Sequence, residues 1–337
     1  MALIGVVVMN YHGYLIIRGG QPGDGAIAEL FDPWTGPLST RFAATFVLVA
    51  GVGVALLTSA ATTPERVVSA RWRLARRGIV LYLLGQLLDR IWPGTIILYY
   101  GAMFALAAVL FRLRSRWLVG IGALAAGAGW WLSVWLFERR EDGVSTAWLT
   151  SPSSSSVRGI AFEVAVNGTH PLLPWLTFFC AGIVIGRCLG APWLRDVLVV
   201  GGVVLFLTAT GASSFASTPF QHHVLSTDPS SRSIVYVASA LGTAMAAFGA
   251  LSWAAERWTR AFDPLRRAGQ LSLTIYIAHI LVFNLLVDWL EVVTPGGVVR
   301  SLAFAGAFWL VAIAGAVLWH RHLGRGPAER AYRALAG

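Results

Sequence analysis

Lysine is absent from this chain, and all 26 of its Lys and Arg positions are arginine. Cysteine is nearly absent as well, with only Cys180 and Cys188, eight positions apart and without a nearby histidine. Two isolated thiols support neither a disulfide framework nor a zinc site. We therefore predict no metal site. The use of arginine in place of lysine is typical of a GC-rich genome and indicates a bacterial source.

Charge is also scarce: 12% of the 337 residues are charged and 56% are hydrophobic. Soluble domains carry about 25% charged residues, and a soluble fold has too little interior to bury this much apolar side chain. The formal net charge of +10 would suggest nucleic acid in a soluble chain, but here the arginines lie between apolar stretches. We interpret them as membrane topology signals and predict no nucleic-acid partner.

Ten apolar runs have roughly the length that crosses about 30 Å of hydrocarbon. They cover residues 2–17, 40–60, 76–92, 95–111, 118–137, 172–188, 197–215, 234–253, 270–290 and 299–319. Continuous apolar runs exclude the alternating pattern of a membrane barrel. The sequence therefore predicts an all-α, polytopic integral membrane protein with about 10 transmembrane helices, expected in the inner (plasma) membrane. The membrane lipids are then its first partners.

Arginine is unevenly distributed between alternate loops. One set of loops, which includes the segment after the second run and the C-terminal segment, holds 18 of the 26 arginines, whereas the other set holds 11 of the 16 acids. By the positive-inside rule the first set is cytoplasmic, and both termini with it. We expect a single transmembrane domain over residues 1–320 and a short cytoplasmic interfacial tail over 321–337. The longest outer loops are expected at about 18–39, 138–171 and 216–233.

Seven segments follow one another across nearly the whole chain: ALIGVVVMNYH, RFAATFVLVAGVGVAL, RLARRGIVLYLLG, TIILYYGAMFALA, GTHPLLPWLTFFCAGIVIGR, GQLSLTIYIAHIL and GPAERAYR. In their order and spacing the chain resembles the heparan-alpha-glucosaminide N-acetyltransferase-like group of bacterial membrane proteins, which includes the family called domain of unknown function 418. The resemblance implies a transmembrane acyltransferase that moves an acyl group, expected to be acetyl, from cytoplasmic acyl-CoA (acetyl-CoA) to an extracytoplasmic sugar or glycolipid. A small-molecule or lipid transporter or flippase is the alternative, and a non-catalytic scaffold is a third. The sequence leaves a homo-oligomer open.

Acyl transfer needs a base for the acceptor proton and a donor for the oxyanion. His12 ends the first run beside Asn10, within reach of a loop that carries Asp32, so an Asp–His relay with an amide donor is feasible there. An ordinary interfacial cap would have the same composition. His279 lies inside an apolar run, where an ionisable group marks either a functional cavity or a hydrogen bond between helices. These four residues are the predicted catalytic set.

The predicted binding residues lie at the ends of the apolar runs. Arg73, Arg76 and Arg77 share a helical face that could meet the phosphates of coenzyme A, although positive-inside topology explains them equally well. Arg41 opens the second run on the outer side, where topology does not favour a cation, so it could pair with an acid or with a substrate carboxylate. His170 precedes the sixth run and could line the outer mouth of the cavity or simply set the turn.

The resemblance also draws attention to the segment FDPWTG in the first outer loop. The human-type member of the group carries a histidine just before a Trp-x-Gly element there, and this chain has Phe31 and Asp32 at that place, followed by Trp34. We assign Trp34 to the predicted substrate-binding residues together with Arg41 and His170. Because this chain lacks that histidine, the resemblance does not supply a catalytic residue at this place.

Overall fold

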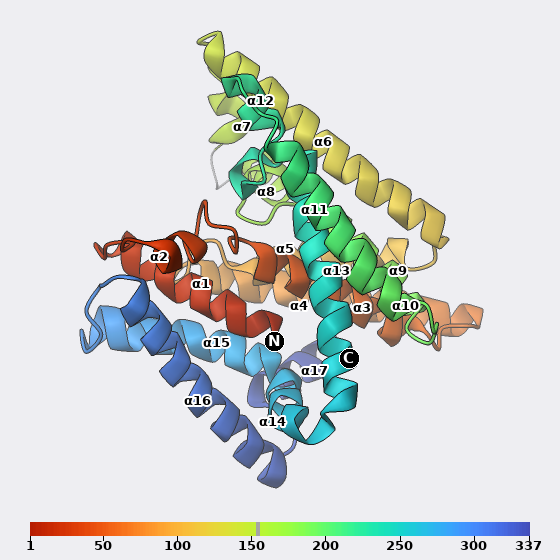
Figure 1. The fold of residues 1–337 in the computed structure, drawn as a ribbon. Helices are drawn as coiled ribbons and strands as arrows, with labels where there is room; N and C mark the ends of the chain where they lie inside the picture. Colours follow the sequence, from red (N-terminus) through yellow and green to blue (C-terminus); the bar gives the residue numbers. More distant parts are fainter. Residues whose placement is uncertain (153–155) are drawn as a thin grey trace. The chain divides into compact units, whose positions relative to one another are not determined.

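The computed structural model describes residues 1–152 and 156–337, and every regular element in these ranges is a helix (Figure 1). The predicted all-α fold is confirmed for this part of the chain. Two compact units are present: unit 1 comprises residues 1–43 and 250–335, and unit 2 comprises residues 44–249 and 336–337. Residues 153–155 of the expected outer loop 138–171 lie outside the described residues.

Unit 1 is built from the two ends of the chain. Its helices are α1 (Ala2–Ile17), α2 (Ala26–Leu30), α14 (Thr259–Gln270), α15 (Ser272–Phe283), the π-helix η4 (Asn284–Trp289), α16 (Val298–His322) and α17 (Pro327–Ala336). Helix α1 packs against both α15 and α16, so segments nearly 300 residues apart in sequence lie side by side (Figure 1). The helix expected in the C-terminal tail is present as α17.

Unit 2 holds the middle of the chain. Its helices are α3 (Arg41–Thr58), α4 (Pro64–Asp89), α5 (Ile96–Leu110), α6 (Ser115–Glu141), α7 (Ala147–Thr150), α8 (Val157–Phe162), η1 (Glu163–Asn167), α9 (Leu172–Arg187), α10 (Leu194–Asp196), η2 (Val197–Gly201), α11 (Gly202–Ser213), α12 (Pro219–Val224), η3 (Pro229–Ser231) and α13 (Ile234–Arg257). The first residues of α3 and the last turns of α13 belong to unit 1.

Six helices in the described ranges are long and apolar enough to cross a membrane. They are Arg41–Thr58, Ser115–Glu141, Leu194–Ser213, Ile234–Arg257, Ser272–Trp289 and Val298–His322. A seventh span is possible by length if Val157–Asn167 and Leu172–Arg187, which are bent by 59° relative to each other, act together. Two shorter apolar helices are α1 and α5. Each of the ten predicted apolar runs falls on a helix, and these helices indicate a membrane protein.

Helix α4 begins well before the apolar run that predicted it. The run starts at residue 76, whereas the helix starts at Pro64, after Thr63, whose side chain accepts a hydrogen bond from the backbone N–H of Arg66 at 3.4 Å. Proline in the first turn and threonine before it are favourable starting residues for a helix. The arginines expected in a loop before the span therefore lie on the first turns of α4.

Glycine permits close helix packing in unit 2. A Cβ atom added at Gly85 would lie 2.4 Å from the Leu98 backbone of α5, and one at Gly182 would lie 2.0 Å from the Leu48 carbonyl oxygen of α3. Small residues allow helix backbones to approach this closely in a membrane. Gly85 and Gly182 therefore allow close packing of α4 on α5 and of α9 on α3.

Aromatic rings fill the core of unit 1. Tyr11 is fully buried, and its ring centroid lies 5.2 Å from that of Phe283, 4.4 Å from that of Phe304 and 5.8 Å from that of Phe308. Such ring pairs add about 0.5–1.5 kcal/mol each beyond burial. The cluster fixes α1 between α15 and α16 and so determines where the polar residues on either side of Tyr11 point.

Candidate functional site

Asn10 of α1 meets His279 of α15 in unit 1. The amide nitrogen of Asn10 lies 3.3 Å from Nε2 of His279, and the hydroxyl of Tyr11 donates to the backbone carbonyl of His279 at 3.0 Å. An amide nitrogen can only donate, so Nε2 of His279 accepts. The lone pair of His279 is thus engaged by Asn10. His279, fully buried, forms a hydrogen bond between helices, the second of the two alternatives that the sequence offered.

His12 of α1 meets Ser301 of α16 on the other side of Tyr11. Nδ1 of His12 lies 3.1 Å from Oγ of Ser301, and that hydroxyl donates to the backbone carbonyl of Gly297 at 3.2 Å. A hydroxyl has one hydrogen, so when Ser301 donates to Gly297 its Oγ accepts from His12, and the His12 proton then sits on Nδ1. Nε2 of His12 is buried and has no hydrogen-bond partner among the described residues. In that tautomer Nε2 carries the lone pair of the ring, which is fully buried.

The side chains of Asn10 and His12 point in different directions from α1. Residues two apart on a helix point to opposite sides, and here their partners are on different helices, α15 and α16. The helix geometry provides two buried pairs, Asn10–His279 and His12–Ser301. The joint action of Asn10 and His12 on one substrate stays a prediction.

Asp32 lies near His12, as the sequence predicted. The loop that carries it packs on α1, because a Cβ atom at Gly13 would lie 3.3 Å from Cβ of Pro33, and the Asp32 carboxylate is close enough to interact electrostatically with the His12 ring. Its Oδ1 accepts from the backbone N–H groups of Trp34 and Thr35 at 2.9 and 2.7 Å. Burial raises the pKa of Asp32, but these hydrogen bonds outweigh it and bring the pKa below its ordinary value. Asp32 is thus held as a carboxylate.

The other predicted residues of unit 1 differ in exposure. Arg41 is 5% exposed, and its Nε donates to the carbonyl of Pro37 at 3.4 Å. Trp34 is 46% exposed, and its backbone N–H donates a hydrogen bond to the Asp32 carboxylate. A buried guanidinium and an exposed indole from the same loop region could contact a sugar or its carboxylate, which keeps both as substrate-binding candidates.

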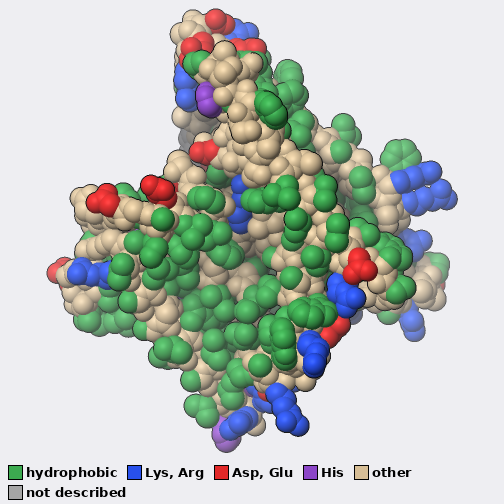
Figure 2. Space-filling view, viewed as in Figure 1, with side chains coloured by type: hydrophobic (Ala, Val, Ile, Leu, Met, Phe, Trp, Pro, Cys, Tyr) green, Lys and Arg blue, Asp and Glu red, His purple; other side chains and the backbone are tan. Residues whose placement is uncertain are grey.

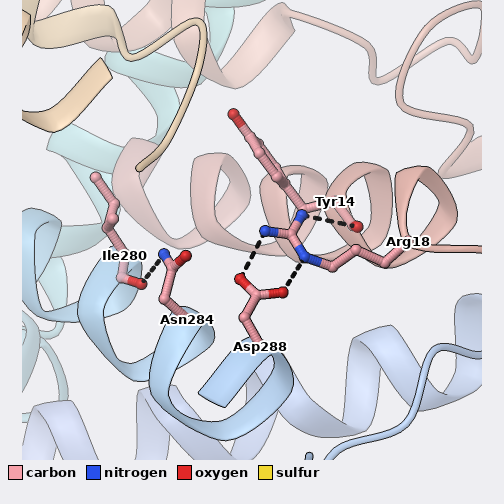
Figure 3. Close-up of polar contacts among 5 residues, drawn as sticks. All are labelled: Tyr14, Arg18, Ile280, Asn284 and Asp288. Carbon is pink, nitrogen blue, oxygen red and sulfur yellow. Dashed lines mark hydrogen bonds and ion pairs between the residues drawn. The ribbon is translucent and has the colours of Figure 1, made fainter. Parts of the chain in front are cut away.

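Arg18 and Asp288 join α1 to η4 near the end of α1 (Figure 3). The guanidinium contacts the carboxylate in bidentate fashion, with Nη2 at 2.7 Å from Oδ2, and Nη1 donates to the Tyr14 carbonyl at 3.4 Å. It also lies 5.0 Å from the ring centroid of Phe283. Asn284, one turn before Asp288, donates to the carbonyl of Ile280 at 2.8 Å. The π-helical turn directs Asp288 toward α1.

His170 lies in unit 2, between η1 and α9. Its ring packs edge-on against Trp175 at 4.5 Å and lies 5.8 Å from the ring of Tyr99, centroid to centroid. The Tyr99 hydroxyl donates to Oε1 of Glu163 at 3.0 Å and accepts from the backbone N–H of Thr169 at 3.1 Å. His170 therefore belongs to a polar cluster at the break between two helices.

Arg232 completes that cluster by binding backbone carbonyls. Its guanidinium donates to Val166, Asn167 and Gly168, the last residues before the break, with Nη2 at 3.4 and 3.2 Å from the second and third of these oxygens. The carbonyls at a helix end have no partner within the helix. Arg232 satisfies them and itself has a φ of 49°, a left-handed conformation that residues other than glycine rarely adopt.

The predicted phosphate-binding arginines lie on one side of α4 in unit 2. Arg73 and Arg77 are separated by four residues, so they share a helical face, and Arg76 is the exposed member of the set. Both Arg73 and Arg77 are half-buried. Because α4 begins at Pro64, the three arginines lie near the middle of the helix and not at its end, where the apolar run had placed them. This cationic face could contact either phosphates or lipid headgroups.

Sequence reasoning missed Ser301, Arg18, Glu163 and Arg232. No local pattern distinguishes Ser301 from other serines in apolar helices, because its significance comes from a histidine 289 positions away. Arg18 and Asp288 each carried a weak signal, a charge at the border of an apolar run. Glu163 was counted only among the 11 acidic residues of the outer loops. The break between η1 and α9 could have been predicted from the glycine and proline of the segment GTHP, which favour a turn.

Residues 187–337 match the model of a family described as protein of unknown function (DUF418). The match supports membership of this family and includes His279 and Ser301, whereas Asn10, His12 and Asp32 lie before it. No curated protein and no solved structure matches the chain. The family description names no activity.

Proposed function

We propose that this protein is a membrane-bound acyltransferase that transfers an acyl group, expected to be acetyl, from cytoplasmic acyl-CoA to a hydroxyl or amine of an extracytoplasmic sugar or glycolipid. The observation that carries the proposal is the buried His12 imidazole. In our proposal Ser301 holds the proton of His12 on Nδ1, and Nε2 has no hydrogen-bond partner among the described residues. A neutral histidine with a free nitrogen has the form that a general base requires.

In the proposed reaction, Nε2 of His12 removes the proton of the acceptor hydroxyl or amine. The acceptor oxygen or nitrogen forms a bond to the thioester carbonyl carbon, the carbon–sulfur bond breaks, and the thiolate of coenzyme A takes the proton back from His12. Asp32, held as a carboxylate near the ring, stabilises the imidazolium that forms between these steps. Arg41 and Trp34 would contact the acceptor.

The donor is assigned to the cationic face of α4. Arginine pairs with phosphate in bidentate fashion, and Arg73, Arg76 and Arg77 place three guanidinium groups within five residues of one helix. The proposal includes a topology of ten spans, with α1 and α5 as short spans and both termini in the cytoplasm. In this topology the arginine face of α4 would lie toward the cytoplasmic side of the inner membrane, where acyl-CoA is found. The resemblance to the heparan-alpha-glucosaminide N-acetyltransferase-like group also supports the proposal.

Calorimetry with acetyl-CoA and protein in nanodiscs tests the donor assignment. We expect binding by the wild type and its loss in the variant Arg73→Ala/Arg76→Ala/Arg77→Ala. The matched control Arg112→Ala/Arg114→Ala/Arg116→Ala removes the same charge from another loop and should bind normally. Absence of binding of acetyl-CoA and of longer acyl-CoA to folded wild-type protein would rule out the donor assignment.

Substitution of His12 tests the base. His12→Gln should leave acetyl-CoA binding unchanged and lower the transfer rate about 10²–10⁴-fold, the usual contribution of general base catalysis. His322→Gln, at an exposed position at the end of α16, is the control and should transfer at the wild-type rate. Equal rates in both variants would show that His12 is not the base.

One observation favours a transporter as the second candidate. The helix pair Val157–Asn167 and Leu172–Arg187 is bent by 59° and carries Glu163 and His170 at the break. Transporters often bind substrates where membrane helices are broken. A transporter of this kind would not require acetyl-CoA, so the calorimetric experiment separates the two candidates.

A further inference from the structure

A long apolar groove lies between α15–η4 and α16 in unit 1. Its volume is about 680 Å³, within the range of about 300–1,000 Å³ that is usual for ligand pockets. From the first helix, Thr274, Ala278, Val282 and Leu286 line it at intervals of four residues, so the groove follows one face of the helix along most of its length. Both helices are apolar enough to cross a membrane, so the groove runs along the direction of a lipid chain.

The groove offers almost no polar contact. Thr274 is one of its few polar side chains, and its hydroxyl contacts the Glu329 carboxylate and accepts from the backbone N–H of Ala328 at 3.1 Å. The indole N–H of Trp319 donates to the carbonyl of Arg325 at 3.0 Å. Because these groups are already engaged, the part of a ligand that enters the groove must be hydrocarbon.

Exposed arginines surround the end of the groove at which Trp319 lies. Arg321 and Arg325 follow Trp319 on the last turn of α16 and in the next loop, and Arg330 and Arg333 lie on α17. The acid of this segment, Glu329, accepts from the backbone N–H groups of Leu273 and Thr274 at 2.7 and 3.0 Å. Figure 2 shows apolar side chains over the middle of α15 and α16, and basic and histidine side chains where α16 ends. The end of the groove is therefore strongly cationic.

We propose that this groove binds an anionic phospholipid, with one acyl chain between α15 and α16 and the headgroup phosphate at Arg321 and Arg325. The shape and chemistry of the groove select a hydrocarbon chain, and the charge at its end selects an anionic headgroup. Neither feature alone requires a lipid, but their continuity matches the division of a phospholipid into an apolar and an anionic part. The inference is independent of the proposed acyl transfer.

Native mass spectrometry of the full-length protein tests the proposal. The protein is equilibrated in detergent with equal amounts of phosphatidylglycerol and phosphatidylcholine that carry the same acyl chains. We expect the wild type to retain phosphatidylglycerol preferentially. Arg321→Ala/Arg325→Ala should weaken its binding about ten- to thirtyfold, since each arginine near a membrane surface contributes about 1 kcal/mol. The control Arg112→Ala/Arg114→Ala removes the same charge elsewhere and should retain the preference.

A glycine pair on α16 tests the groove itself. A Cβ atom at Gly315, which lines the groove, or at Gly306, which does not, would meet no atom within 4 Å. Gly315→Leu should lower the retention of both lipids, whereas Gly306→Leu should leave it unchanged. Equal retention by the two glycine variants would overturn the chain site, and equal effects of the two arginine pairs would overturn the headgroup site. A dimer that Gly315→Leu abolishes would show that a second copy of the chain, and not a lipid, covers the groove.

Discussion

The polar cluster around His12 in unit 1 and the one around Arg232 in unit 2 are built in different ways. In unit 1, the pairs Asn10–His279 and His12–Ser301 join side chain to side chain between helices. In unit 2, Arg232 and the Tyr99 hydroxyl instead bond backbone groups at the break between η1 and α9. A side chain that bonds backbone groups could contact a substrate only if those backbone groups lost their partner, which would disrupt the fold. A hydrogen bond between two side chains can break while the backbone stays in place.

Under the proposed function, this difference would assign stability to the cluster around Arg232 and chemistry to the one around His12. Carbonyls at a helix end have no partner within the helix, and Arg232 supplies one for residues 166–168 at the bend. The His12 pair leaves Nε2 without a partner among the described residues, an arrangement that reduces stability and is characteristic of functional sites. Substitutions in the two units should therefore separate folding from activity.

The largest effect on stability is expected for Arg232→Met. The variant removes a charged donor from three backbone carbonyls, and hydrogen bonds to charged groups contribute about 1.5–3 kcal/mol each, so we expect a loss of at least about 4.5 kcal/mol in the free energy of unfolding. Titration with a denaturing detergent measures it. Arg195→Met, at an exposed arginine whose partner is its sequence neighbour Asp196, is the control and should change stability by less than about 0.5 kcal/mol. Similar losses in both variants would contradict the structural role of Arg232.

Hydropathy predicted the position of every long helix, because the apolar length needed to cross a membrane is a local property of the sequence. The start of α4 was missed because the arginines that precede its apolar run hide a helix that begins at Thr63 and Pro64. His12 and His279 could be selected because a histidine in an apolar run is rare and needs a partner. Their partners could not be predicted, since Ser301 and Asn10 are 289 and 269 positions away from them.

A smaller effect is expected for Ser301→Ala. The variant leaves Nδ1 of His12 without its acceptor, and an unsatisfied buried donor costs about 1–3 kcal/mol. Ser239→Ala is the matched control, because Ser239 is also fully buried and its hydroxyl donates to the carbonyl of Tyr236 in its own helix. Nitrogen-15 NMR of the histidine rings gives a second readout: His12 should carry its proton on Nδ1 in the wild type and populate both tautomers in Ser301→Ala. An unchanged tautomer would show that Ser301 does not fix the proton.

The smallest effect is expected for the ion pair between Arg18 and Asp288, although its bidentate geometry is the best in the described part of the chain (Figure 3). Both side chains are 25% exposed, and ion pairs that solvent reaches contribute about 0.2–1 kcal/mol. A double-mutant cycle with Arg18→Met and Asp288→Asn should give a coupling energy of about 0.5–1 kcal/mol. The value should fall in about 1 M salt, where the screening length is about 3 Å. The pair of Arg266 and Asp263 has a 67% exposed arginine and should give a smaller value in the same experiment. A coupling energy well above 1 kcal/mol that salt does not reduce would mean that Arg18 and Asp288 are shielded from water, and unit 1 would then contain a third buried polar pair.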